Sequence, residues 1–226
     1  MVQLPFSDRC EAGRLLSSTL ITGNWPEDTI VLALPRGGVP IGSAVASMLG
    51  APLDVVVVRK LGVPRQPELA MGAIASAGIR VLDEDLIRDL GISDATLDSV
   101  VAKEAVELER RERLYRKGRP APDLHDRTVI LVDDGLATGS TMSAAVRYVN
   151  TFQPAAVTVA VPIGSAQACQ QIRSMGATCI CLATPEPLYS VGAWYSDFQQ
   201  TTDYEVQRLL DQPYQRNRPR WNPANP

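Results

Sequence analysis

The chain has 226 residues, of which 45% are hydrophobic and 21% are charged. This composition is typical of a globular protein with a sizeable core, built as one large domain or as a domain with a small appendage. The formal net charge of -3 and the isoelectric point near 5.3 argue against broad binding to the nucleic-acid backbone. No apolar run is long enough to span a bilayer, and the N-terminus lacks a signal-peptide pattern. We therefore expect a cytoplasmic protein that does not act in a membrane.

The cysteines and the single histidine do not suggest a metal or triad site. Cys10, Cys169, Cys179 and Cys181 have neither zinc-type nor redox spacing, and the last two share one side of a predicted strand. We interpret the cysteines as reduced, buried small residues. His125 lies in the polar segment PAPDLHDR, which predicts a surface loop.

The first predicted elements are a helix, a buried strand and a second helix. Apolar residues recur at helical spacing from Phe6 to Leu20, with Ser7 as a candidate cap. The run TIVLAL, from Thr29 to Leu34, predicts a buried strand that ends in the turn Pro35-Arg36-Gly37-Gly38. Helical spacing resumes from Ile41 to Leu49.

A second apolar run and a region without periodicity follow. Leu53 to Val58 predicts a strand buried on both faces, ending at the adjacent cations Arg59 and Lys60. Residues 61–72 contain two prolines and no periodic pattern, which predicts a mobile loop. Two short strands, Ala73 to Ala77 and Ile79 to Leu82, are expected to form a hairpin at Gly78.

A strongly charged stretch separates these elements from the second half of the chain. Ser93 is a good cap for a long helix from Asp94 to Arg116. Its ERRERLYRK run is interpreted as a solvated face with ion pairs four residues apart, rather than as a nucleic-acid surface.

The most informative stretch is VILVDDGLATGST, from Val129 to Thr141. It predicts a buried strand, two adjacent aspartates, a turn with small residues, and a helix capped by Ser140 or Thr141. The amides of such a turn and helix N-terminus suit a phosphate. The aspartates would repel a phosphate and suit hydroxyl groups or a hydrated metal ion instead. One ligand that presents a phosphate beside a cis-diol is a ribose 5-phosphate.

The remaining pattern predicts an α/β fold. A strand from Ala156 to Pro162, a helix from Ser165 to Met175 and a strand from Ala177 to Leu182 alternate. Alternating strands and helices imply a parallel sheet with helices on both faces. An aromatic-rich segment then leads to a final helix that begins at Thr202 or Asp203.

The run VILVDDGLATGST resembles the phosphoribosyl-pyrophosphate (PRPP) signature of the type I phosphoribosyltransferases. The opening FSDRCEAGRLL resembles a subgroup of that family whose acceptor is unassigned. The resemblance implies that Asp133 and Asp134 bind the ribose hydroxyls and hold Mg2+ through water. It also implies that the next loop binds the 5-phosphate; its residues are Gly135, Leu136, Ala137, Thr138, Gly139, Ser140 and Thr141.

The same resemblance assigns the other parts of a site. The turn after the first strand would bind pyrophosphate, through a peptide at Pro35–Arg36 or Arg36–Gly37 that is expected to be cis. The predicted pyrophosphate ligands are Arg36, Gly37, Gly38, Arg59 and Lys60. Residues 61–72 correspond to the catalytic loop, which is expected to close as a lid; Glu68, its one carboxylate, is the candidate for proton transfer.

The resemblance spans most of residues 6–210 and predicts one phosphoribosyltransferase domain over residues 1–212, followed by a disordered tail at 213–226. A hood would come from residues 184–200 with the N-terminal segment, and Trp194 and Tyr195 would cover a planar base there. Packing of these aromatic residues onto the core is the alternative.

The predicted activity is transfer of a phosphoribosyl group from PRPP, with Mg2+, to a base or another acceptor, releasing pyrophosphate. A non-catalytic regulator that binds PRPP or a nucleotide is the alternative, because one fold hosts many functions. The alanine at 137 stands where members that act on 6-oxopurines carry an aspartate. The acceptor and the oligomeric state, a homodimer included, are left open.

Overall fold

The computed structural model describes residues 2–75 and 78–212. The tail that the sequence predicts to be disordered, 213–226, lies outside the described residues, as do the side chains at positions 67 and 68.

The centre of the molecule is a five-stranded parallel sheet, as the alternating pattern predicts. In the order in which they pair, its strands are β2 (Leu53–Val55), β1 (Ile30–Ala33), β6 (Thr128–Val132), β7 (Ala156–Ile163) and β8 (Thr178–Ala183). Strands β1 and β6 pair in register from Ile30↔Val129 to Ala33↔Val132.

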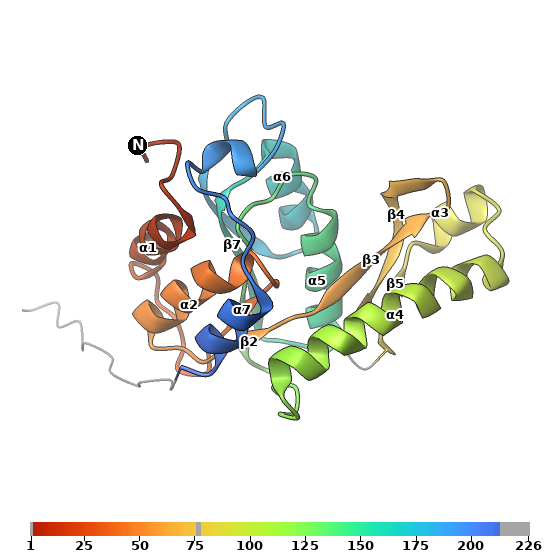
Figure 1. The fold of residues 1–226 in the computed structure, drawn as a ribbon, viewed down its shortest axis with the longest axis horizontal. Coiled ribbons are helices and arrows are strands. Elements are labelled where there is room, and N and C mark those ends of the chain that lie inside the picture. Colours follow the sequence, from red (N-terminus) through yellow and green to blue (C-terminus); the bar gives the residue numbers. More distant parts are fainter. Residues whose placement is uncertain (1, 76–77, 213–226) are drawn as a thin grey trace, which may run out of the picture.

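Helices cover both faces of this sheet (Figure 1). Helices α1 (Arg9–Leu20) and α2 (Gly38–Leu49) pack on one face, and α5 (Ser140–Asn150) and α6 (Ala166–Ser174) pack on the other. Alternate strand residues therefore enter different clusters, so both sets are buried. This double burial explains why the core strands are continuous apolar runs in the sequence.

A second, antiparallel sheet projects from the central domain, to the right in Figure 1. It consists of β3 (Val58–Val63), β4 (Gln66–Ala75) and β5 (Arg80–Leu82), and it is followed by α3 (Glu84–Asp89) and the long α4 (Asp94–Arg116). One side of this sheet packs on α4, which also contacts α7 (Asp203–Leu210), and the buried residues of this cluster include Leu61, Val63 and Leu108. We refer to this sheet with α3 and α4 as the arm.

Two predictions in this region were wrong. The strand predicted from Leu53 to Val58 ends at Val55, and the chain enters the second sheet at Val58. The residues predicted as an irregular loop, 61–72, instead belong to a hairpin that turns at Arg65, whose φ is 68°. The hairpin tolerates the prolines because Pro64 lies in the turn, while Pro67 lies where β4 has no pairing with β5.

The predicted cap of α4 is confirmed, whereas the predicted caps of α1 and α5 were wrong. Ser93 accepts a hydrogen bond from the amide of Thr96, so the cap predicted for α4 is confirmed. The cap of α1 is Asp8 rather than Ser7: Asp8 accepts from the amide of Glu11 at 2.8 Å. The cap of α5 is Gly139, with φ 77°, rather than a hydroxyl residue.

The segment before α1 pairs with the chain at residues 194–196. The amide of Phe6 donates to Trp194 O at 2.9 Å, and the amide of Ser196 donates to Phe6 O at 2.7 Å. The N-terminal segment therefore pairs with residues 194–196, and a hood built from residues 184–200 stays a prediction. Short turn η2 (Gly192–Trp194) precedes this contact.

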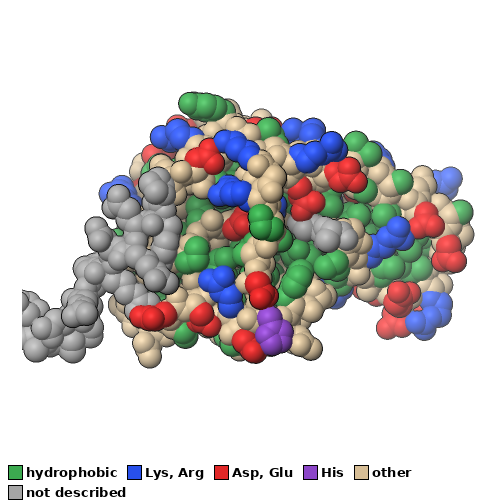
Figure 2. Space-filling model, turned by 90° about the horizontal axis from the view of Figure 1, so that it is seen from below, with side chains coloured by type: hydrophobic (Ala, Val, Ile, Leu, Met, Phe, Trp, Pro, Cys, Tyr) green, Lys and Arg blue, Asp and Glu red, His purple; other side chains and the backbone are tan. Residues whose placement is uncertain are grey.

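Figure 2 shows basic and acidic side chains interspersed over one face of the molecule rather than grouped by sign. On α4, Arg111 pairs with Glu107 and Arg113 pairs with Glu109, as the four-residue spacing predicts. Among the described residues, no helix is long and apolar enough to cross a membrane.

A hydrogen bond from a buried tyrosine of α4 links α4 to the start of α7. The ring of Tyr115 is fully buried, and its hydroxyl donates to Asp203 Oδ1 at 2.6 Å. This hydrogen bond is the main cause that holds the pKa of Asp203 below its ordinary value. The contact therefore stabilises the fold only while Asp203 is ionised.

Replacing Tyr115 with phenylalanine should lower the free energy of unfolding by about 1–2 kcal/mol at pH 7, because a hydrogen bond to a charged acceptor is lost. Since the folded pKa of Asp203 is depressed, the stabilisation exists above the unfolded value of about 4 and is lost as the pH falls through the lower folded pKa. Urea unfolding of parent and Tyr115→Phe at several pH values measures both effects. Asp211→Asn, which removes the exposed pair with Lys117, is the control and should change stability much less than Tyr115→Phe.

Candidate functional site

The strand order reverses direction between β1 and β6, and we call the region at the carboxyl ends of these two strands the crevice. From β1 the chain passes through α2 to β2 on one side, and from β6 it passes through α5 to β7 on the other. In open α/β sheets, ligands bind outside the carboxyl ends of the strands at such a switch point. The turn at 35–38 follows β1 and the acidic turn at 133–139 follows β6, so both predicted motifs lie at this crevice.

The two aspartates differ in their partners. Asp133 Oδ1 accepts a hydrogen bond from the amide of Asp134 at 2.8 Å. Asp134 Oδ2 accepts from Arg9 Nε at 2.9 Å and from Arg9 Nη2 at 2.8 Å. Burial raises the pKa of both carboxyls; the charge of Asp134 raises that of Asp133 further, whereas the guanidinium of Arg9 opposes the rise at Asp134.

The turn after β1 touches the acidic pair with bare backbone. A Cβ at Gly37 would overlap Asp134 Oδ2, and a Cβ at Gly38 would lie 2.7 Å from Val132 O and 2.9 Å from the Cα of Asp133. Only glycine leaves room for these contacts. The peptide bond between Pro35 and Arg36 is cis, as predicted.

The loop after the acidic pair is anchored to the neighbouring strand β7. The amide of Leu136 donates to Ile163 O at 2.9 Å, and Leu136 O accepts from the amide of Ser165 at 2.9 Å. Ser165 Oγ also donates to Ala137 O at 2.7 Å. Leu136 is thus an anchor whose own amide is already bonded, although the sequence prediction placed it among the phosphate ligands.

The rest of this loop presents amides and hydroxyls at the start of α5. Within the described part of the chain, the amides of Ala137, Thr138 and Gly139 donate to no protein acceptor. Thr138 Oγ1 lies 3.2 Å from Ser140 Oγ, and the side chain of Thr141 is exposed. Adjacent unbonded amides at a helix N-terminus form an arrangement that suits an anion.

The predicted pyrophosphate cations have separate environments. Arg36 lies 3.6 Å from Asp203 Oδ1 at the start of α7. Arg59 is inside β3 and donates from Nε to Glu104 of α4 at 2.8 Å, so it does not follow a core strand as the sequence suggested. Because side chains alternate along a strand, Lys60 points to the opposite face, on the side where Val58 packs against the cluster containing α5.

The predicted hood residues, Trp194 and Tyr195, both pack on the cluster that contains α1 and α2. Tyr195 is 5% exposed, and its hydroxyl donates to Asp134 O at 2.6 Å. Burial is the main cause that raises the pKa of this phenol. Trp194 is half-buried against the cluster formed by α1 and α2. Glu68 lies in β4, but its side chain is outside the described part of the structure.

The structure adds Arg9, which the sequence analysis missed. Arg9 is the first residue of α1, immediately after its cap Asp8. A cation in the first turn of a helix interacts unfavourably with the helix dipole. Its position was therefore a signal in the sequence that Arg9 is held by a contact outside the helix. No local pattern could have named Asp134, 125 positions away, as its partner.

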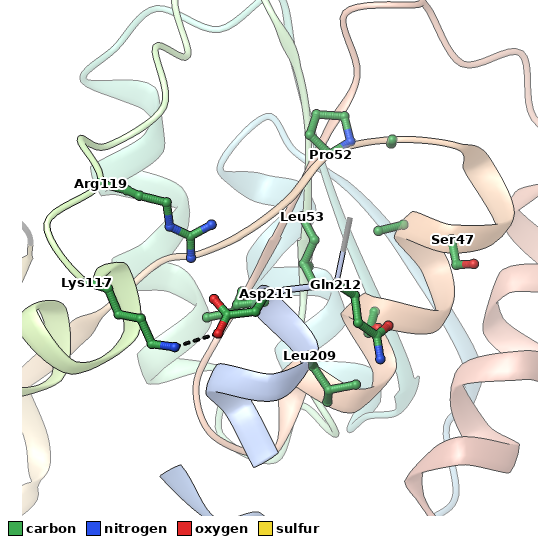
Figure 3. Close-up of a pocket in the computed structure, with 12 residues that line it drawn as sticks. Ser47, Pro52, Leu53, Lys117, Arg119, Leu209, Asp211 and Gln212 are labelled. Atoms are coloured by element: carbon green, nitrogen blue, oxygen red, sulfur yellow. Dashed lines mark hydrogen bonds and ion pairs between the residues drawn. The ribbon is translucent and has the colours of Figure 1, made fainter. Parts of the chain in front are cut away.

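A cavity lies elsewhere, between α2, the start of β2, and the ends of α4 and α7 (Figure 3). Its volume is about 850 Å³, and Lys117 and Asp211 form an ion pair at its edge. Because it adjoins the amino end of β2, it is away from the crevice where the carboxyl ends of β1 and β6 meet. We assign the candidate site to the crevice because the acidic pair and the glycine turn are there.

Among the described residues, no cluster of three or more histidine, cysteine or acidic side chains could hold a metal ion.

The chain belongs to the phosphoribosyl transferase domain family, whose model matches residues 10–183. A crystal structure of TT1426 from Thermus thermophilus is 40% identical and has a TM-score of 0.82, covering 91% of this chain and 97% of that one. A Mycobacterium tuberculosis H37Rv protein named "Putative phosphoribosyl transferase" is 45% identical over 208 residues. That match covers 91% of this chain and 46% of the relative, so this chain spans about half the relative's length. The predicted family and the α/β fold are both confirmed.

Replacing Gly37 with alanine should push Asp134 and Arg9 aside, because the new methyl group overlaps Asp134 Oδ2. We expect the free energy of unfolding to fall by about 1–3 kcal/mol, the usual cost of overpacking. Denaturant unfolding measures the loss. Ala137→Ser, at an exposed position of the neighbouring loop, is the control; equal midpoints for Gly37→Ala and the parent would contradict the contact.

Proposed function

We propose that the protein transfers a phosphoribosyl group from PRPP to a base or another acceptor and releases pyrophosphate. The observation that carries this proposal is the crevice at which an acidic pair adjoins a turn of unbonded amides. A ribose 5-phosphate presents a diol and a phosphate, the two groups that these features suit. Membership of the phosphoribosyl transferase domain family supports the same substrate class.

Each part of PRPP has a proposed set of ligands. Asp133 and Asp134 accept hydrogen bonds from the ribose hydroxyls, and the loop at 137–141 donates to the 5-phosphate. The backbone of Gly37 and Gly38, with Arg36, binds the pyrophosphate group. Lys60 and Arg59 are the further cations proposed for it; Arg59 would have to leave Glu104 to take that role.

The proposed reaction exchanges one bond at the ribose C1 for another. The bond from C1 to a pyrophosphate oxygen breaks, the acceptor atom bonds to C1, and pyrophosphate leaves with the bonding electrons. A proton on the acceptor is then lost to a base or to solvent. Because positive charge develops on the ribose ring, as in other glycosidic chemistry, the protein must hold the leaving group and exclude water.

Mg2+ fits this site as a partner of the substrate rather than as a caged ion. Magnesium is commonly bound by one or two carboxylates, retained waters and substrate phosphates. Asp133 and Asp134 are the residues that would hold it, through water. When bound, it would neutralise charge on the PRPP oxygens.

Proton transfer and cover over the site are proposed for the hairpin of β3 and β4. Ala137 has no group that could accept a proton, and Glu68 is the carboxylate that the hairpin carries. Trp194 remains a candidate for one wall of the acceptor site. The acceptor itself and a homodimeric assembly stay predictions, as does the cytoplasmic location.

The activity can be tested by incubating the protein with Mg2+, PRPP and a panel of purine bases, pyrimidine bases and amines. We expect pyrophosphate release that requires one class of acceptor. Tight PRPP binding without release for any acceptor would favour the regulatory alternative. Absence of both binding and release would remove the proposal.

Substituting both Asp133 and Asp134 with asparagine should weaken binding of Mg-PRPP strongly while the fold is kept. Each hydrogen bond to a charged acceptor contributes about 1.5–3 kcal/mol, so the loss should exceed about 100-fold. Titration calorimetry measures it. The control is Asp123→Asn with Asp126→Asn, two exposed aspartates before β6; equal affinity for the site variant and this control would contradict the assignment.

A further inference from the structure

Arg9 uses all sides of its guanidinium group within the protein. Nε and Nη2 both donate to Asp134 Oδ2, and Nη1 donates to the carbonyl oxygen of Gln199 at 2.7 Å. The guanidinium carbon lies 3.9 Å from the ring centroid of Phe198, in the range of a cation–π contact. The side chain is only 12% exposed, so these contacts are shielded from water.

These contacts join three segments that are distant in the sequence. Arg9 begins α1, Asp134 follows β6, and Phe198 and Gln199 lie in the segment after η2. The same segment is held close by the backbone pairing of Phe6 with residues 194–196 and by the hydroxyl of Tyr195 on Asp134 O. Arg9 is the charged link in this junction, because its side chain reaches both the ribose carboxylate and the hood.

We propose that Arg9 is a positioning residue for the PRPP site: it fixes Asp134 through Oδ2 and holds residues 194–199 against the ribose site. This inference rests on the proposed function. The ion pair leaves the second oxygen of Asp134, Oδ1, to accept a ligand hydroxyl. Arg9 itself need not touch the substrate, because its donors are directed at the protein.

Charge and geometry point in the same direction. Two ionised carboxylates beside a polyphosphate repel it, and the guanidinium of Arg9 offsets one of those charges. The planar guanidinium group of Arg9 also holds the Asp134 carboxylate and the Gln199 carbonyl in a fixed arrangement. Lysine carries the same charge as a single flexible ammonium group, so it cannot reproduce that geometry. Removing the guanidinium should therefore weaken PRPP binding, and restoring only the charge should not repair it.

The test compares Arg9→Lys and Arg9→Ala with Arg14→Ala, a control at an exposed position of the same helix. We expect Kd for Mg-PRPP to rise about 10-fold or more in both Arg9 variants, with Arg14→Ala unchanged. Methylguanidinium should recover part of the affinity lost in Arg9→Ala and should leave the affinity of Arg14→Ala unchanged. In a double-mutant cycle with Asp134→Asn, the losses should be less than additive.

Hydrogen exchange provides a readout that does not depend on PRPP. The amides of Ser196 and Asp197, which donate to Phe6 O and Ser7 O, should exchange faster in both Arg9 variants than in Arg14→Ala. Unchanged exchange together with parental Kd in Arg9→Lys would overturn the inference while leaving the proposed function intact. A parent that binds no PRPP would remove the proposed function and the ribose role of Arg9 with it. Exchange would then decide the hood contact alone.

Discussion

The site depends on the contact between the glycine turn after β1 and the acidic pair after β6. Parallel pairing of the two strands, from Ile30↔Val129 to Ala33↔Val132, brings their carboxyl ends together. Gly37 and Gly38 then let one backbone lie against the aspartates of the other. The turn after β1 leads directly into α2, whereas residues 135–139 connect the acidic pair to α5. One pair of strands therefore places the acidic pair and the glycine turn side by side.

Charge in this crevice is balanced by elements from the two ends of the chain. Arg9, from the first helix, pairs with Asp134, and Asp203, from the last described helix, lies near Arg36. Asp203 is held in turn by Tyr115 of α4. The long charged helix, whose role could not be inferred from its composition, thus takes part in positioning a side chain of the candidate site. Its exposed ion pairs contribute little by comparison.

The sequence predicted those features of the fold that depend on residues close together in the chain. The buried strands, the Ser93 cap and the motif at 129–141 were readable because apolar periodicity and capping act over a few residues. The break after Val55 was not readable, since the apolar run LDVVVV continues across it and only tertiary pairing divides it. The partners of Arg9 and Arg59 could not be predicted either, because Asp134 and Glu104 are distant from them in the sequence. Gly139 as a cap was missed because hydroxyl residues stood beside it.

The break between β2 and β3 also determines how the arm can move. Val56 and Val57, which connect the two sheets, are 2% and 1% exposed. The amide of Val56 donates to Ala33 O, while Arg116 pairs with Asp54 and donates to Val55 O. The root of the arm is therefore clamped to the central domain and cannot serve as a free hinge. We therefore expect any motion that covers the crevice to occur beyond this root, in the hairpin whose register shifts at Gly62.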